Sequence, residues 1–209
     1  MKNPKRIVSD AYDRIAERYL EWRALQPRQG ELAKWLSILH DHLQPGAAVL
    51  DIGCGAGIPL TRALTESFDV TGVDISERQV QLARKNVPAA RFIHGDVTTL
   101  AFSPRSFDAV VASYSLFHIP RLEHQTLFRS IAAWLRRDGV MLANFGVGNR
   151  EVDYAQDWLG APLFWSSFDA EGEKNAMRAA GFELVFDSIE IMVEDGLPHS
   201  FLLLLARNT

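Results

Sequence analysis

Between residues 47 and 146, short apolar segments alternate with segments that predict helices. The apolar segments read as strands and are AAVLDI at 47–52, DVTGVD at 69–74, ARFIHGD at 90–96, FDAVVAS at 107–113 and VMLANF at 140–145. Helices are expected between them at 57–67, 76–86 and 121–137. Continuously apolar strands separated by helices indicate a parallel sheet that is covered on both faces.

The chain departs from this alternation at both ends. Apolar residues at helical spacing predict helices within residues 1–44. Asp169 is a typical N-cap for a later helix that ends near Gly181. Two extended segments follow, at 183–194 and 200–207, and their short connection predicts a hairpin. The expected fold is therefore α/β, with N-terminal helices and a doubly wound, mostly parallel seven-stranded sheet whose last strand is antiparallel.

The composition argues against charged polymers and membranes as partners. The 209 residues carry a formal net charge of -4 and no Lys/Arg-rich run, whereas nucleic acids and anionic membranes select basic surfaces. The longest aliphatic run, FLLLL at 201–205, is too short to span a bilayer. Cys54 is the only cysteine, and the first 22 residues lack the apolar stretch of a signal peptide. We expect a cytoplasmic protein without a metal; the oligomeric state stays open.

A glycine-rich loop follows the first expected strand. Gly53, Gly55 and Gly57 stand in DIGCGAGIP, where glycine lets the backbone adopt positive φ and approach a ligand closely. Dinucleotide-binding loops have the spacing GxGxxG. Here the spacing is GxGxG, and Ile58 stands where the third glycine of that pattern belongs. The loop alone leaves both an NAD-type cofactor and a different nucleotide-bearing cofactor open.

Two acidic residues end the next two expected strands. Asp74 ends the second strand and Asp96 ends the third. Ligands of open α/β sheets bind beyond the carboxyl ends of the strands. A carboxylate at Asp74 offers two acceptor oxygens to a ribose diol. A carboxylate at Asp96 can accept a hydrogen bond from the exocyclic amine of adenine. Together with the glycine loop, they indicate a pocket for an adenosine-containing cofactor.

Several stretches resemble, in order, the motifs of class I S-adenosylmethionine-dependent methyltransferases: VLDIGCGAGIPL, VTGVDIS, FIHGDVTTL, SFDAVVASYSLFHI and LRRDGVMLANF. AYDRIAERYLEW resembles the N-terminal helix that closes over the cofactor in the small-molecule branch of this family. The resemblance implies a single methyltransferase domain over 1–209. Its expected parts are a helical cover at 1–44, a cofactor-binding core at 47–146, an aromatic-rich cap insert at 148–168, and a C-terminal helix and β-hairpin at 169–209.

The resemblance also implies which residues bind S-adenosyl-L-methionine, with S-adenosyl-L-homocysteine as the product. The methionine half would lie against Asp51, Gly53, Cys54 and Gly55. Its carboxylate end would be covered by Tyr12, Tyr19 and Arg23. The nucleoside half would contact Asp74 at the ribose, Ile75, Asp96 and Val97 at the adenine, and the cofactor would rest on Ser113.

Two residues just past the fourth strand are candidates for catalysis. His118 and Tyr114 lie in SYSLFHI, where an acceptor would meet the methyl group. Either can act as a general base or position the acceptor. A histidine satisfied by packing and a backbone hydrogen bond is an equally good interpretation of His118.

The insert at 148–168 is rich in aromatic residues, and Tyr154, Trp158 and Trp165 are the candidates for acceptor binding. The alternative is that these rings cover the edge of the sheet or a dimer contact. The favoured function is methyl transfer from S-adenosylmethionine to a small-molecule acceptor by in-line displacement. An NAD-type oxidoreductase, and a methyltransferase-like protein that binds S-adenosylmethionine but performs other chemistry or none, remain the alternatives.

Overall fold

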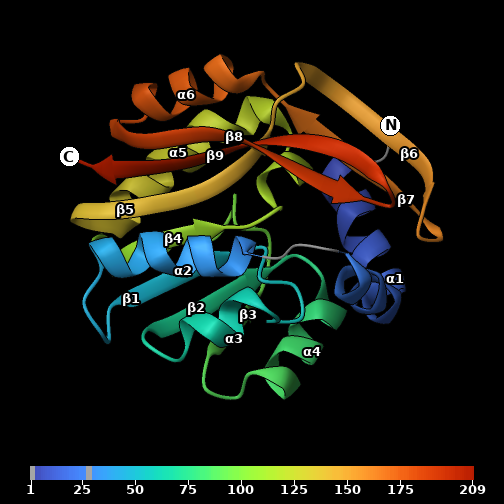
Figure 1. Cartoon of the computed structure of the whole chain (residues 1–209), viewed down its shortest axis with the longest axis horizontal. Helices are drawn as coiled ribbons and strands as arrows, with labels where there is room; N and C mark the ends of the chain where they lie inside the picture. Colours follow the sequence, from blue (N-terminus) through green and yellow to red (C-terminus); the bar gives the residue numbers. More distant parts are fainter. Residues whose placement is uncertain (1–2, 27–29) are drawn as a thin grey trace.

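A seven-stranded sheet forms the centre of the protein (Figure 1). The computed structural model describes residues 3–26 and 30–209. The strand order is β3-β2-β1-β4-β5-β9-β8, with bounds β1 Ala48–Ile52, β2 Asp69–Asp74, β3 Arg91–His94, β4 Phe107–Ala112, β5 Leu135–Gly146, β8 Phe182–Glu194 and β9 Leu197–Asn208. The first five strands pair in parallel, and β9 runs antiparallel to both β5 and β8. The expected fold class and the antiparallel last strand are confirmed.

Helices cover both faces of this sheet: α2 Glu31–His42, α3 Leu60–Leu64, α4 Glu77–Asn86, α5 Arg121–Trp134 and α6 Ala170–Ala179. Alternate strand residues point to opposite faces, so Leu50 and Val49 of β1 enter different cores. Leu50 packs in the core that contains Phe128 of α5 and Met177 of α6. Val49 packs in the core that contains Leu39 of α2. This two-sided burial explains why the strands are continuously apolar.

The helix bounds differ from expectation where tertiary contacts decide them. The helix expected at 57–67 is the short α3, because the chain before it is occupied by turns with positive φ at Gly53, Gly55 and Gly57. The helix expected at 121–137 ends at Trp134, and β5 starts directly after it. The Asn208 amide at the end of β9 donates to the carbonyls of Ala132 and Leu135 and so replaces helical hydrogen bonds there.

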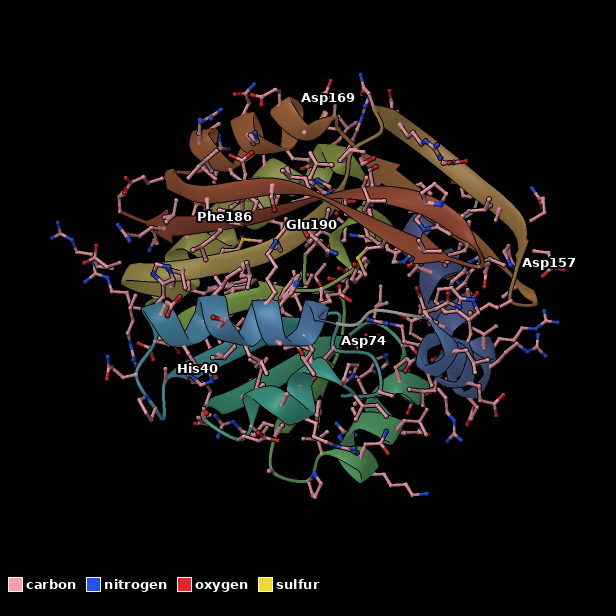
Figure 2. The ribbon with its side chains drawn as sticks, in the orientation of Figure 1. His40, Asp74, Asp157, Asp169, Phe186 and Glu190 are labelled. Atoms are coloured by element: carbon pink, nitrogen blue, oxygen red, sulfur yellow. The ribbon has the colours of Figure 1, made fainter. Side chains whose placement is uncertain are left out.

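The C-terminal helix follows the local signals of the sequence. Asp169 precedes α6, and its Oδ1 accepts the Gly172 N–H at 2.8 Å (Figure 2). Gly181 follows the helix with φ +97°, a conformation that favours glycine. The expected cap and termination of this helix are confirmed.

The insert between β5 and α6 forms a second, two-stranded antiparallel sheet, β6 Arg150–Trp158 and β7 Ala161–Ser167. It packs on α1 Pro4–Leu25, where Leu163 and Phe164 share a buried cluster with Ala11 and Ile15. Figure 1 shows α1 and this hairpin together beside the main sheet. Helix α1 and the hairpin therefore support each other. Of the helices in the described part of the chain, none is long and apolar enough to cross a membrane.

Candidate functional site

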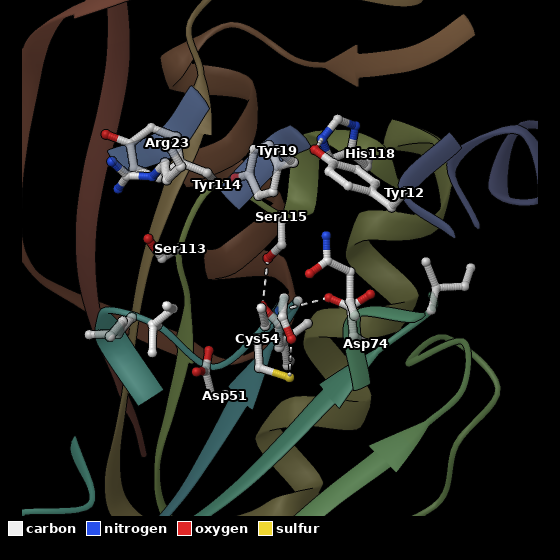
Figure 3. A pocket seen from close by; sticks show the side chains of 18 of the residues that line it. Tyr12, Tyr19, Arg23, Asp51, Cys54, Asp74, Ser113, Tyr114, Ser115 and His118 are labelled. Carbon is white, nitrogen blue, oxygen red and sulfur yellow. Dashed lines mark hydrogen bonds between the residues drawn. The ribbon is translucent and has the colours of Figure 1, made fainter. Parts of the chain in front are cut away.

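A cavity of about 610 Å³ opens beyond the carboxyl ends of β1, β2, β3 and β4, beneath α1 (Figure 3). Its wall includes every residue that the sequence assigned to the cofactor: Tyr12, Tyr19, Arg23, Asp51, Gly53, Cys54, Gly55, Asp74, Ile75, Asp96, Val97 and Ser113. Tyr114 and His118, the two catalytic candidates, also line it. The fold thus brings these residues together, and their individual roles stay predictions.

The loop after β1 lies tightly against the next segments of the site. The Gly53 N–H donates to the Val73 carbonyl at 2.8 Å, and the Ser115 hydroxyl donates to the Ile52 carbonyl at 2.7 Å. Gly53 has φ +72°, and a Cβ added to it would stand 2.2 Å from the Ser115 Cβ. A side chain therefore has no room at position 53.

Asp51 lies buried at the end of β1, below this loop. Its Oδ2 accepts the Thr61 hydroxyl at 2.6 Å. Burial raises the pKa of Asp51 to about 7, the Thr61 hydrogen bond opposes this shift, and the nearby Asp74 charge adds to it. Asp51 therefore titrates close to neutral pH.

The Asp74 carboxylate is held by backbone donors at the end of β2. Its Oδ2 accepts the Gly55 N–H at 2.9 Å, and its Oδ1 accepts the Ser76 N–H at 2.8 Å (Figure 3 shows its place beside the loop). Removal from water raises the pKa of Asp74 to about 6, and the two backbone hydrogen bonds oppose the shift. Each oxygen keeps a second lone pair with which it can accept a hydroxyl donor.

Asp96 has a partner that the sequence did not reveal. Lys5 of α1 forms an ion pair with Asp96 Oδ2 at 2.8 Å, and Thr98 donates to Oδ1 from its N–H and its hydroxyl. Burial alone would raise the pKa of Asp96, but the hydrogen bonds from Lys5 and Thr98 outweigh it and leave the pKa lowered. Lys5 also lines the cavity and contacts Glu123 at 2.7 Å. Only folding brings Lys5 to this end of the sheet, since about ninety residues separate it from Asp96.

His118 at the end of η1, Leu116–His118, has a defined tautomer. Its Nδ1 lies 2.8 Å from the Phe164 carbonyl, which only accepts, so Nδ1 carries the proton. Its Nε2 therefore accepts the Tyr12 hydroxyl, 3.0 Å away. Burial lowers the pKa of His118 to about 4, although the Phe164 hydrogen bond raises it. His118 is neutral at physiological pH and presents a basic nitrogen to Tyr12 at the cavity wall.

Tyr114 is fixed by its backbone. It has φ +55°, and its N–H donates to the Asn144 Oδ1 at 2.6 Å. Its ring packs edge-on against Phe201 of β9, with centroids 4.9 Å apart. The Arg23 guanidinium lies over the same ring, 5.9 Å from its centroid. Tyr114 therefore closes one wall of the cavity.

The aromatic residues expected to bind the acceptor do not line the cavity, although two of them pack on residues that do. Tyr154, Trp158 and Trp165 are absent from the lining formed by the described residues. Trp158 packs on Tyr12 and Tyr19 at centroid distances of 6.1 and 5.8 Å, and Trp165 lies 6.0 Å from His118. Tyr154 is 39% exposed on the hairpin. The hairpin thus supports the residues that face the cavity, and acceptor contact by its rings stays a prediction.

Gln79 is a cavity residue that the sequence did not single out. Its side chain is 1% exposed, and neither atom of its amide has a hydrogen-bond partner within the described residues. Buried polar groups in native proteins nearly always have a partner, so this amide fits a polar ligand in the cavity. The described residues contain no group of three or more His, Cys, Asp or Glu that could hold a metal ion.

Comparison with known proteins identifies the fold around this cavity. The family described as "Methyltransferase domain" matches residues 49–139, which span the glycine loop, both strand-end acids and η1. Residues 49–139 thus resemble a methyltransferase domain, and the seven-stranded sheet has the fold of class I methyltransferases. Methyltransferases of this class depend on S-adenosylmethionine, and the residues that line the cavity fit that cofactor: glycines against the wall, acceptor oxygens at Asp74, and an amide at Gln79 that has no partner among the described residues.

Two curated methyltransferases illustrate the range of its relatives. The chain is 38% identical over 106 residues to a malonyl-[acyl-carrier protein] O-methyltransferase of Erwinia pyrifoliae, covering 50% of this chain and 38% of that protein. It is 30% identical over 175 residues to a sterol 24-C-methyltransferase of Gibberella zeae, covering 74% of this chain and 44% of that protein. The matched part of this chain thus spans less than half the length of either relative.

A solved structure extends the likeness to the whole chain. The magnesium protoporphyrin IX methyltransferase from Synechocystis PCC 6803, crystallised with bound SAH, superimposes with a TM-score of 0.73. The match covers 99% of this chain and 100% of that one at 18% identity. At this identity the likeness shows a shared fold, which includes α1 and the terminal hairpin β8–β9.

Proposed function

We propose that this methyltransferase transfers a methyl group from S-adenosylmethionine to a small-molecule acceptor. The observation that carries the proposal is the cavity itself, where the glycine loop, Asp74 and the Asp96–Lys5 pair meet at one end of the sheet. The names of the two relatives, a malonyl-[acyl-carrier protein] O-methyltransferase and a sterol 24-C-methyltransferase, support an organic acceptor. The net charge of -4 argues against a nucleic acid. A cytoplasmic location belongs to the proposal and rests on the sequence alone.

The chain's own residues would bind and orient the two reactants. S-adenosylmethionine, when bound, supplies an electrophilic methyl group on a sulfonium sulfur. Asp74 would accept the ribose hydroxyls, and the glycine loop would let the backbone approach the methionine half. Tyr12, Tyr19 and Tyr114 would exclude water above it. Because the methyl group is already activated, holding the acceptor in line would supply most of the rate enhancement.

Tyr12 and His118 would hold the proton that a protic acceptor releases. The neutral His118 tautomer accepts at Nε2, and Tyr12 links that nitrogen to the cavity. A proton that reaches Nε2 gives an imidazolium in a site where the sulfonium charge has just been lost. The number of positive charges in the site is then the same before and after transfer, which limits the cost of burying the imidazolium.

Replacing His118 with alanine should lower kcat by about 100-fold, the lower range for loss of general-base catalysis, and change the affinity for S-adenosylhomocysteine less than twofold. Because the pKa of His118 is about 4, its protonation should not reduce wild-type activity above about pH 5. The measurement is a kcat and pH profile with the acceptor found by screening a metabolite panel for S-adenosylhomocysteine release. An unchanged kcat on the true acceptor would remove His118 from the mechanism.

Calorimetric titration with S-adenosylhomocysteine and with NADH tests the proposal directly. We expect S-adenosylhomocysteine to bind and NADH not to bind, because the loop lacks the third glycine of the dinucleotide pattern. Absence of S-adenosylhomocysteine binding would contradict the proposal, and NADH binding would favour the oxidoreductase alternative. Transfer of labelled methyl to any member of the metabolite panel would then separate a transferase from a protein that only binds the cofactor.

A further inference from the structure

Gln79 occupies the first turn of α4, next to Asp74. The helix is capped by Ser76, whose hydroxyl accepts the Gln79 N–H at 3.1 Å. This cap fixes the backbone of Gln79, and its side chain turns inward to 1% exposure at the cavity wall. The side-chain Oε1 lies 3.8 Å from the position that a Cβ on Gly55 would take. Gln79 is therefore placed beside the Gly55–Asp74 hydrogen bond.

The Gln79 amide offers a hydrogen-bond donor beside the acceptor oxygens of Asp74. Asp74 offers only acceptor oxygens, and the nearby N–H groups of Gly55 and Ser76 already donate to them. A ribose diol carries hydroxyls that both donate and accept. The Gln79 Nε2 can donate to a hydroxyl oxygen while Asp74 accepts the hydroxyl protons. Within the described residues, both amide atoms of Gln79 lack any competing partner.

We propose that Gln79 is a cofactor-binding residue whose amide hydrogen-bonds the ribose hydroxyls beside Asp74. The proposal rests on the proposed function, because the ligand is the adenosyl part of S-adenosylmethionine. Asp74 and Gln79 together then recognise the sugar, Asp74 by accepting and Gln79 by donating. Burying this amide without a partner is unfavourable in the free protein, so ligand binding recovers a hydrogen bond that folding leaves unmade.

The test is calorimetric titration of the full chain with S-adenosylhomocysteine and with 5′-methylthioadenosine, which has the nucleoside but no amino acid. The variant is Gln79→Met, which keeps the length of the side chain and removes both polar atoms. Its matched control is Gln81→Met, an exposed glutamine of the same helix. We expect Gln79→Met to reduce the affinity for both ligands by the same factor of about ten. Gln81→Met should change neither affinity more than twofold.

Two further readouts separate a binding role from a structural one. Without ligand, the thermal midpoint of Gln79→Met should equal or exceed that of the wild type, because the variant buries no unpaired amide. Gln79 contacts one of the two ribose hydroxyls, so one deoxy form of 5′-methylthioadenosine, 2′ or 3′, lacks that hydroxyl. For that form, the affinities of Gln79→Met and the wild type should differ by less than twofold.

Each other outcome has a defined meaning. A loss confined to S-adenosylhomocysteine would place the amide on the methionine half and overturn the ribose assignment. Unchanged affinities, or a lowered thermal midpoint with unchanged affinities, would overturn a binding role for Gln79 altogether. Failure of the wild type to bind either ligand would instead contradict the proposed function.

Discussion

Replacing Gly53 with alanine should reduce the affinity for S-adenosylhomocysteine by about 100-fold and lower the thermal midpoint. The added Cβ would stand 2.2 Å from the Ser115 Cβ and 2.9 Å from its Oγ. Ser115 cannot rotate away freely, because its hydroxyl donates to the Ile52 carbonyl. The left-handed conformation of Gly53 costs a side chain about 1–2 kcal/mol, and the clash adds about 1–3 kcal/mol. These costs lower the stability of the folded protein. Relief of the clash also moves the loop or Ser115 at the cavity wall, and a displacement that loses about 2.8 kcal/mol of cofactor contact weakens binding about 100-fold, because 1.4 kcal/mol is about tenfold in affinity.

Gly46→Ala is the matched control for this variant. Gly46 has φ +81°, similar to Gly53, but no described atom lies within 4 Å of the position of its Cβ. It should be destabilised by about 1 kcal/mol through backbone strain alone and bind S-adenosylhomocysteine normally. Adding Ser115→Gly to Gly53→Ala should restore part of the affinity, because it removes the clashing atoms. Equal affinities of Gly53→Ala and Gly46→Ala would show that the close approach of the loop to Ser115 does not shape the site.

Replacing Asp74 with asparagine should also reduce the affinity for S-adenosylhomocysteine by about 100-fold, since hydrogen bonds to an ionised group contribute about 1.5–3 kcal/mol each. The amide also turns a donor toward one of the two backbone N–H groups that the carboxylate accepts, those of Gly55 and Ser76. Isothermal titration at pH 7.5 measures the loss. The control is Asp69→Asn, at the opposite end of the same strand, where the side chain is exposed and paired with Arg91. Equal affinities of the two variants would remove Asp74 from the site.

The same carboxylate predicts how binding depends on pH. Burial raises the pKa of Asp74 to about 6 in the free protein, and a ribose diol is bound more strongly by the ionised carboxylate, which accepts at both oxygens. The affinity of the wild type should therefore be constant well above pH 6 and fall toward tenfold per pH unit below it. Binding should release a proton near pH 6, and Asp74→Asn should lose this slope. Asp51, with a pKa of about 7, titrates in the wild type and in Asp74→Asn alike. Only the difference between the affinity–pH profiles of these two proteins therefore reports on Asp74.

Local sequence motifs predicted the site residues that stand at the ends of strands. Gly53, Asp74 and Asp96 stand at strand ends, and the parallel topology that the apolar strands imply brings all three to one edge of the sheet. The sequence also indicated Tyr12 and His118 separately. Their hydrogen bond joins residues 106 positions apart and depends on how α1 packs against the β6–β7 hairpin.

The α/β class, the antiparallel last strand and the edge of the sheet that carries the site were predictable from local sequence patterns, because periodicity, helix caps and glycine turns act over a few residues. Packing of the whole chain was needed to pair Lys5 with Asp96 and to fix the tautomer of His118 through Phe164. It also leaves Gln79 at the cavity wall with no amide partner in the part of the chain that the structure describes. Apolar burial positions the elements but does not specify which polar groups meet between them. Those pairings depend on distances and directions that exist only once the helices and the hairpin have packed on the sheet.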